Sequence, residues 1–101
     1  MKTEIQQHDD HFLVTLEGEF NTTAAVEAEE TLKPLRESTD RDVIVECENL
    51  DYIASSGLRI LLAILKHVKA AGHTMTLRHV NDDIMDVFRL TGFNTLFNFE
   101  N

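Results

Sequence analysis

Residues 43–70 read VIVECENLDYIASSGLRILLAILKHVKA, and this stretch decides the fold class. It starts with an alternating, β-branched run at residues 43–48, which predicts a strand. It ends with leucines and isoleucines at helical spacing, which predict a helix to about Ala71. Between the two, Ser55 or Ser56 is expected to cap the helix, because serine is a preferred cap residue. The stretch therefore predicts a strand–loop–helix unit of an α/β protein.

The helix in this stretch is predicted to be the most buried of the molecule. Its apolar side chains recur with a period close to 3.6 residues and form a wide stripe. They are Leu58, Leu61, Leu62, Leu65 and Val68, with Ile60 and Ile64 at the margins.

The start of the chain predicts an antiparallel hairpin. Two alternating runs, residues 2–7 and 11–17, are joined by a polar turn at Asp9 and Asp10, and Gly18 is expected to end the second strand. A helix to about residue 37 should follow the next polar residues, which offer capping side chains. These residues are Asn21, Thr22 and Thr23, and the predicted apolar face is Val26, Ala28, Leu32 and Leu35.

Within that helix, Pro34 conflicts with the pattern and predicts a kink or an early end, because proline removes a hydrogen bond. Beyond the central unit, residues 74–80 predict a strand and Asn81 caps a helix over residues 82–90. Residues 95–99 predict the last strand.

This order predicts one α/β domain over residues 1–101. Its mixed sheet has four to five strands: an antiparallel N-terminal hairpin, then parallel β-α units with right-handed crossovers. The strands alternate apolar and polar residues instead of running continuously apolar. The helices should therefore cover mainly one face, which argues against a doubly wound nucleotide-binding fold.

Composition excludes several classes of function. The formal net charge is -9, from 18 acidic and 9 basic side chains, so nucleic acid and anionic membranes are unfavourable partners. The polar N-terminus has no signal-peptide core, and no run approaches the roughly 18 apolar residues that span a bilayer. A single cysteine, Cys47, indicates a reducing compartment. We expect a cytoplasmic protein without membrane insertion.

The serine loop is the most informative candidate site. A helix start offers free backbone N–H groups and a positive dipole end, so a phosphate on Ser55 would be tolerated there. Ser56 is the rival acceptor, expected at the first helical position with its hydroxyl near solvent. Arg59 should lie one turn into the helix, where it could pair with a phosphate or an acidic partner. The alternatives are a plain N-cap at Ser55 and a solvated arginine.

Catalysis receives little support from the sequence. A nucleophilic serine needs a base within hydrogen-bond reach, and none of the five histidines is placed by sequence beside Ser55. The run from Asp9 to His11 is interpreted as a polar turn instead of a metal cluster. Zinc-ligand spacing and phosphate-binding glycine loops are absent from the sequence. We therefore expect no enzyme activity and no cofactor.

Three motifs resemble a known family. Residues 52–59, YIASSGLR, look like the Asp-Ser-Ser/Thr-Gly-Leu signature of the STAS domain, which includes bacterial anti-sigma factor antagonists. Residues 18–21, GEFN, resemble the family's Gly-Glu-Leu-Asp at the end of the second strand. Residues 87–93, VFRLTGF, resemble its terminal helix end. The resemblance covers nearly the whole chain and implies a mixed sheet with packed helices.

The resemblance also implies a mechanism. In the family, the first serine of the pair, here Ser55, is phosphorylated by an anti-sigma factor with a GHKL-type serine kinase site. The unphosphorylated antagonist binds that factor, phosphorylation releases it, and a metal-dependent serine phosphatase restores binding. The partner-binding surface would comprise Asn21, Thr22, Thr23, Ala54, Ser55, Ser56, Gly57 and Arg59.

Two positions depart from the family pattern, because Ala54 and Asn21 stand where it often has aspartate. Both changes remove a carboxylate expected near the serine. They favour an alternative, in which the chain is a constitutive STAS scaffold, or a subunit of a transport or signalling assembly, without phosphorylation.

Overall fold

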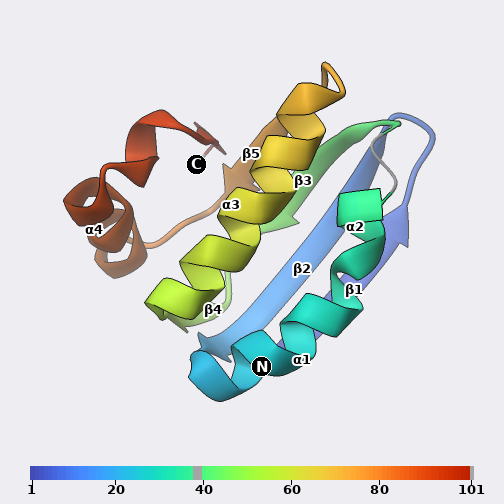
Figure 1. The fold of residues 1–101 in the computed structure, drawn as a ribbon. Coiled ribbons are helices and arrows are strands. Elements are labelled where there is room, and N and C mark those ends of the chain that lie inside the picture. The colour runs from blue at the N-terminus through green and yellow to red at the C-terminus, as the bar shows by residue number, and fades with distance from the viewer. Residues whose placement is uncertain (38–39, 101) are drawn as a thin grey trace.

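Strands and helices alternate along most of the chain in the computed structural model, which describes residues 1–37 and 40–100 (Figure 1). The strands are β1 (Lys2–Gln7), β2 (His11–Phe20), β3 (Asp42–Glu46), β4 (Leu50–Ile53), β5 (Met75–Arg78) and β6 (Asn98–Glu100). The helices are α1 (Thr22–Thr31), α2 (Lys33–Glu37), α3 (Ser55–Ala70) and α4 (Asp82–Thr91), with a 3-10 turn η1 (Phe93–Thr95).

The sheet confirms the predicted hairpin followed by parallel units. Its main path runs β1-β2-β3-β5-β6, with β1 antiparallel to β2 and all later neighbours parallel. Four of these five strands lie where they were predicted. The last strand was predicted too early, at residues 95–99: Gly92, with a φ of +78°, leads into η1, and β6 starts only at Asn98. A sixth, β4, pairs in parallel with the end of β2 and was not predicted. Its four residues do not alternate between buried and exposed, so the period-2 signal was missing.

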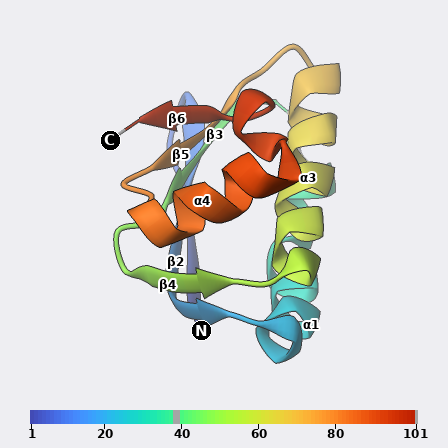
Figure 2. The same cartoon turned by 90° about the vertical axis from the view of Figure 1, so that its left-hand side faces the viewer.

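The helices cover mainly one face of the sheet, as the strand pattern predicted. Figures 1 and 2 show α1 and α3 side by side on that face, with α4 beside β4. On β2 and β3 the buried residues alternate with half-buried ones. The buried set towards the core includes Val14, Leu16, Val43 and Val45, and the half-buried set includes Leu13, Thr15, Ile44 and Glu46.

The break predicted at Pro34 is present, but the predicted apolar face of the first helix was wrong at one residue. α1 ends at Thr31, and Pro34 lies in the first turn of α2, where its missing N–H costs nothing. Val26 is 70% exposed, and Ala25 takes its expected place. The buried face follows Ala25, Ala28, Leu32 and Leu35, and one residue of offset turns Val26 about 100° away from it.

Gly18 does not end the second strand, contrary to the prediction. Its φ of +98° suits glycine, and the pairing register shifts between Gly18 and Glu19. β2 then continues to Phe20 and pairs with β4. This irregularity directs the end of β2 towards the start of α3.

The single cysteine is part of the packing. Cys47 is 2% exposed, and burial, with a smaller contribution from Glu46, raises the pKa of its thiol to about 12. The thiol therefore stays protonated at neutral pH and is a poor nucleophile.

Candidate functional site

The serine turn joins β4 to α3, and neither serine caps the helix. Ala54 is the N-cap residue, in an extended conformation and without a side-chain hydrogen bond. Its N–H donates to the carbonyl of Phe20 at 2.8 Å, and its own carbonyl accepts from Leu58 at 3.0 Å. These two bonds fix the helix start one residue before the expected position. Ser55 is consequently the first helical residue, and it is exposed.

The structure separates the two candidate serines. Ser56, expected near solvent at the first helical position, is the second residue of α3 and half-buried. Its Oγ is buried and has no hydrogen-bond partner among the residues that the structure describes. The Ser55 side chain therefore offers the accessible position, and the simple N-cap interpretation of Ser55 is wrong.

Gly57 holds the turn against the core. It is buried, and a Cβ at this position would lie 3.0 Å from the ring of Phe20 and 3.1 Å from Ile53. Such a close approach leaves no room for a side chain without a shift of the aromatic ring. Gly57 thus packs beneath the surface and is not an exposed contact residue.

The start of α1 lies beside the serine turn. A groove of about 380 Å³ between α1 and α3 includes Thr22, Val26, Ser56 and Arg59 in its lining. Asn21 caps α1, since its side-chain oxygen accepts a hydrogen bond from the N–H of Ala24 at 2.9 Å. An asparagine performs this role as well as an aspartate.

The other predicted surface residues differ in their setting. Thr23 is exposed on the first turn of α1 and does not line the groove. Arg59 is exposed, as predicted, and no carboxylate of residues 1–37 or 40–100 lies within ion-pair distance of it. Arg59 is therefore a cation available to a partner or to a phosphate.

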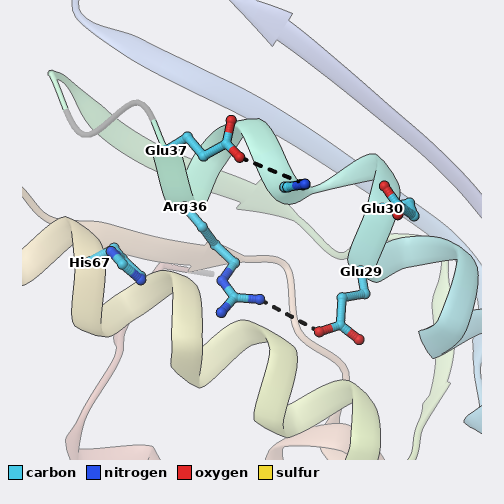
Figure 3. Close-up of a pocket in the computed structure, with 6 residues that line it drawn as sticks. Glu29, Glu30, Arg36, Glu37 and His67 are labelled. Atoms are coloured by element: carbon cyan, nitrogen blue, oxygen red, sulfur yellow. Dashed lines mark ion pairs between the residues drawn. The ribbon is translucent and has the colours of Figure 1, made fainter.

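A second hollow adjoins the first along α2 and α3 (Figure 3). Both of its basic side chains with a fixed charge are paired with carboxylates: Arg36 with Glu29 at 3.6 Å, and Lys33 with Glu37 at 3.9 Å. All of these side chains are substantially exposed, so the pairs contribute little energy. We assign no ligand to this hollow.

The serine turn itself holds no catalytic arrangement within the described part of the chain, because no histidine or carboxylate is hydrogen-bonded to Ser55 or Ser56. Sequence reasoning missed a different group. Glu46, Glu48 and His79 bring one ligand atom each within 4.8 Å of the others. In the sequence these residues stand near the ends of two predicted strands, and only the structure shows that the two strands are neighbours.

The missing cap at Ala54 gives a direct prediction. An Ala54→Asp substitution should stabilise the protein by about 1 kcal/mol, because the carboxylate can accept from free N–H groups and lies at the positive end of α3. The gain should be present at neutral pH and decline as pH falls and the carboxylate protonates. Urea unfolding measures it. The matched control is Ala71→Asp at the opposite cap of α3, which should give no gain; equal gains would refute the capping argument.

The structure is an α/β fold that presents an exposed serine at a helix start. A family model described as the STAS domain matches residues 2–101, and the chain belongs to the STAS domain family.

The comparisons also identify similar proteins. An anti-sigma-B factor antagonist of Staphylococcus aureus is 30% identical over 96 residues, which cover 95% of this chain and 89% of that protein. A crystal structure of a protein from Thermotoga maritima, described as a putative anti-sigma factor antagonist, superposes with a TM-score of 0.87 at 18% identity, covering 98% of this chain and 86% of that one. The phosphorylated form of the Bacillus cell fate determinant SpoIIAA superposes with a TM-score of 0.75 at 16% identity, over 99% and 92% of the chains. These structures confirm the fold.

Among the described helices, none has the length and apolar character that a bilayer crossing requires.

Proposed function

We propose that this protein is a cytoplasmic anti-sigma factor antagonist controlled by phosphorylation of Ser55. In its unphosphorylated state it binds an anti-sigma factor that carries a GHKL-type serine kinase site. Phosphorylation releases that factor, and a metal-dependent serine phosphatase restores binding. The protein acts by binding and not by catalysis, and so regulates transcription indirectly. The single observation that carries the proposal concerns Ser55, which is exposed at the first position of α3 and does not cap the helix.

The physical basis of the switch is local electrostatics. A phosphate on Ser55 would add about two negative charges to a protein of net charge -9. Buried in a packed interface, that group would lose its hydration and repel acidic side chains of the partner. The free backbone N–H groups at the start of α3 keep the phosphate compatible with the folded domain. Release therefore requires no unfolding.

The choice of Ser55 over Ser56 is supported by access. A kinase must reach the hydroxyl oxygen, and the Oγ of Ser56 is buried. Arg59 lies one helical turn after Ser55 on α3, and Asn21 follows Phe20, whose carbonyl accepts from the N–H of Ala54; we place the partner contact on this surface.

Asn21 and Ala54, which replace aspartates of the family pattern, differ in their structural consequences. Asn21 keeps its capping hydrogen bond, so its change from aspartate is structurally neutral. Ala54 leaves α3 without a side-chain cap, and a kinase that recognises a carboxylate there would not recognise this chain. That difference supports the alternative of a constitutive scaffold.

Phosphate transfer separates the two functions. With a candidate anti-sigma kinase and radiolabelled ATP, we expect about one phosphate per chain in the wild type and in Ser56→Ala. Ser55→Ala should take up none. Label that persists in Ser55→Ala would contradict the assignment of the site. The kinase should first be shown to phosphorylate its own known antagonist. If the wild-type protein then takes up no label from it, the constitutive scaffold is favoured.

A further inference from the structure

A cluster of ligand-type side chains lies at the ends of two parallel strands, outside the serine turn. Glu46 is the last residue of β3, Glu48 follows it by two, and His79 comes directly after β5. β3 and β5 are neighbouring strands (Figure 2). Their pairing places Glu46 opposite Arg78. The carboxyl ends of parallel strands are where α/β proteins commonly place ligands.

The cluster has a geometry that suits a cation. Oε2 of Glu46 lies 2.8 Å from Nδ1 of His79, and one ligand atom from each of the three residues lies within 4.8 Å of the others. Ligands of a tetrahedral ion with bonds of about 2.0–2.2 Å are separated by roughly 3.4 Å. The contact between Glu46 and His79 must therefore open by only about half an ångström, which the half-exposed His79 side chain permits.

Neighbouring groups hold this arrangement in place. Arg78 contacts the other oxygen of Glu46, Oε1, at 3.1 Å and leaves Oε2 directed at His79. The N–H of His79 donates to the carbonyl of Glu100, and its φ of +56° is a conformation that a non-glycine residue seldom adopts. Groups that orient the ligands in this way are typical of metal sites.

The carboxylate of Glu48 completes the set. It is exposed and, within the described residues, no donor is hydrogen-bonded to it; only its backbone N–H contacts Glu46, at 3.3 Å. The His79 ring contacts Glu46 alone, and the Glu48 carboxylate has no partner among the residues that the structure describes. A divalent ion would satisfy all three ligands at once.

We propose that Glu46, Glu48 and His79 form a binding site for a divalent transition-metal ion of the Zn²⁺ class. The imidazole ligand selects such ions over Mg²⁺ and Ca²⁺, which prefer oxygen ligands alone. Three protein ligands leave one position for water. The neighbouring guanidinium of Arg78 competes for Glu46, so the dissociation constant should be micromolar instead of nanomolar. A bound ion would crosslink the carboxyl ends of β3 and β5.

Isothermal titration of the full chain with ZnCl₂ tests the site. We expect one ion per chain with a micromolar dissociation constant, and no comparable binding of Mg²⁺ or Ca²⁺. His79→Gln and Glu48→Gln should each weaken Zn²⁺ binding at least tenfold; Glu48 is exposed, so its variant should fold normally. Zn²⁺ at a hundredfold excess over its dissociation constant should also raise the melting temperature by several degrees.

Two other histidines provide matched controls, because each contacts a carboxylate and belongs to no three-ligand cluster among residues 1–37 and 40–100. His73 lies 3.2 Å from Asp42, and His11 lies 2.6 Å from Asp10. His73→Gln and His11→Gln should leave Zn²⁺ affinity unchanged. Absence of one-to-one binding to the wild type, unchanged affinity in His79→Gln and Glu48→Gln, or an equal loss in either control would overturn the proposal.

Discussion

Replacing Phe20 by alanine should lower the free energy of unfolding by about 3–5 kcal/mol, a large part of the roughly 5–15 kcal/mol of a typical domain. The ring is fully buried at the end of β2, beneath the position of Gly57. Its loss removes apolar contacts and leaves a cavity under the first turn of α3. Urea unfolding followed by circular dichroism measures the change. The control, Leu90→Ala on α4, removes a side chain that is 87% exposed and should change stability by less than about 0.5 kcal/mol.

A double-mutant cycle makes this prediction specific to the contact between Phe20 and Gly57. Gly57→Ala alone should cost about 1–3 kcal/mol, because the new Cβ lies 3.0 Å from the ring. In the Phe20→Ala background the same substitution should cost much less, since the ring is gone. Strictly additive costs would show that Gly57 is required for another reason.

The second large effect concerns binding. Ser55→Asp should weaken binding to the cognate anti-sigma factor at least about thirtyfold, because burying a charge at an interface typically costs 2 kcal/mol or more. Ser55→Ala should bind as tightly as the unphosphorylated wild type. Aspartate carries one charge and a phosphoserine about two, so genuine phosphorylation should have the larger effect. Titration calorimetry with the purified pair measures the three affinities.

The control for that experiment adds the same charge elsewhere. Gln7→Glu places a carboxylate on the exposed end of β1, which pairs with Phe12 at the opposite end of β2 from Phe20 and the serine turn. It should weaken binding far less than Ser55→Asp. Comparable losses in the two variants would indicate general repulsion by an acidic protein, and equal affinities for Ser55→Asp and Ser55→Ala would refute the switch.

Much of this fold could be predicted from sequence because its strongest signals are periodic. The apolar stripe of α3 recurs from Leu58 to Val68 within a helix of 16 residues, so its period was unambiguous, and β2, β3 and β5 were marked by alternating apolar and polar residues. β4 was not predicted, because only the first and last of its four residues are buried and they therefore show no alternation. The bulge at Gly18 was not predicted, because a glycine that follows an alternating run more often indicates the end of the strand.

The site was predicted in outline and misplaced in detail. Serine is a common cap, so the helix was expected to begin at Ser55 or Ser56. The hydrogen bond from Ala54 to Phe20 places the cap one residue earlier, and no local pattern reveals a bond to another strand. The burial of the Ser56 hydroxyl has the same origin, because the shifted start makes Ser56 the second residue of α3 instead of its cap or first residue. The cluster at Glu46 and His79 could not be predicted, since the register between β3 and β5 creates it.

The measurement that tests the central claim most directly is the intact mass of this protein purified from its own cells. The account predicts a second species heavier by one phosphate, lost in Ser55→Ala and retained in Ser56→Ala. A chain that carries no phosphate under any growth condition, or a phosphate that survives in Ser55→Ala, would contradict it.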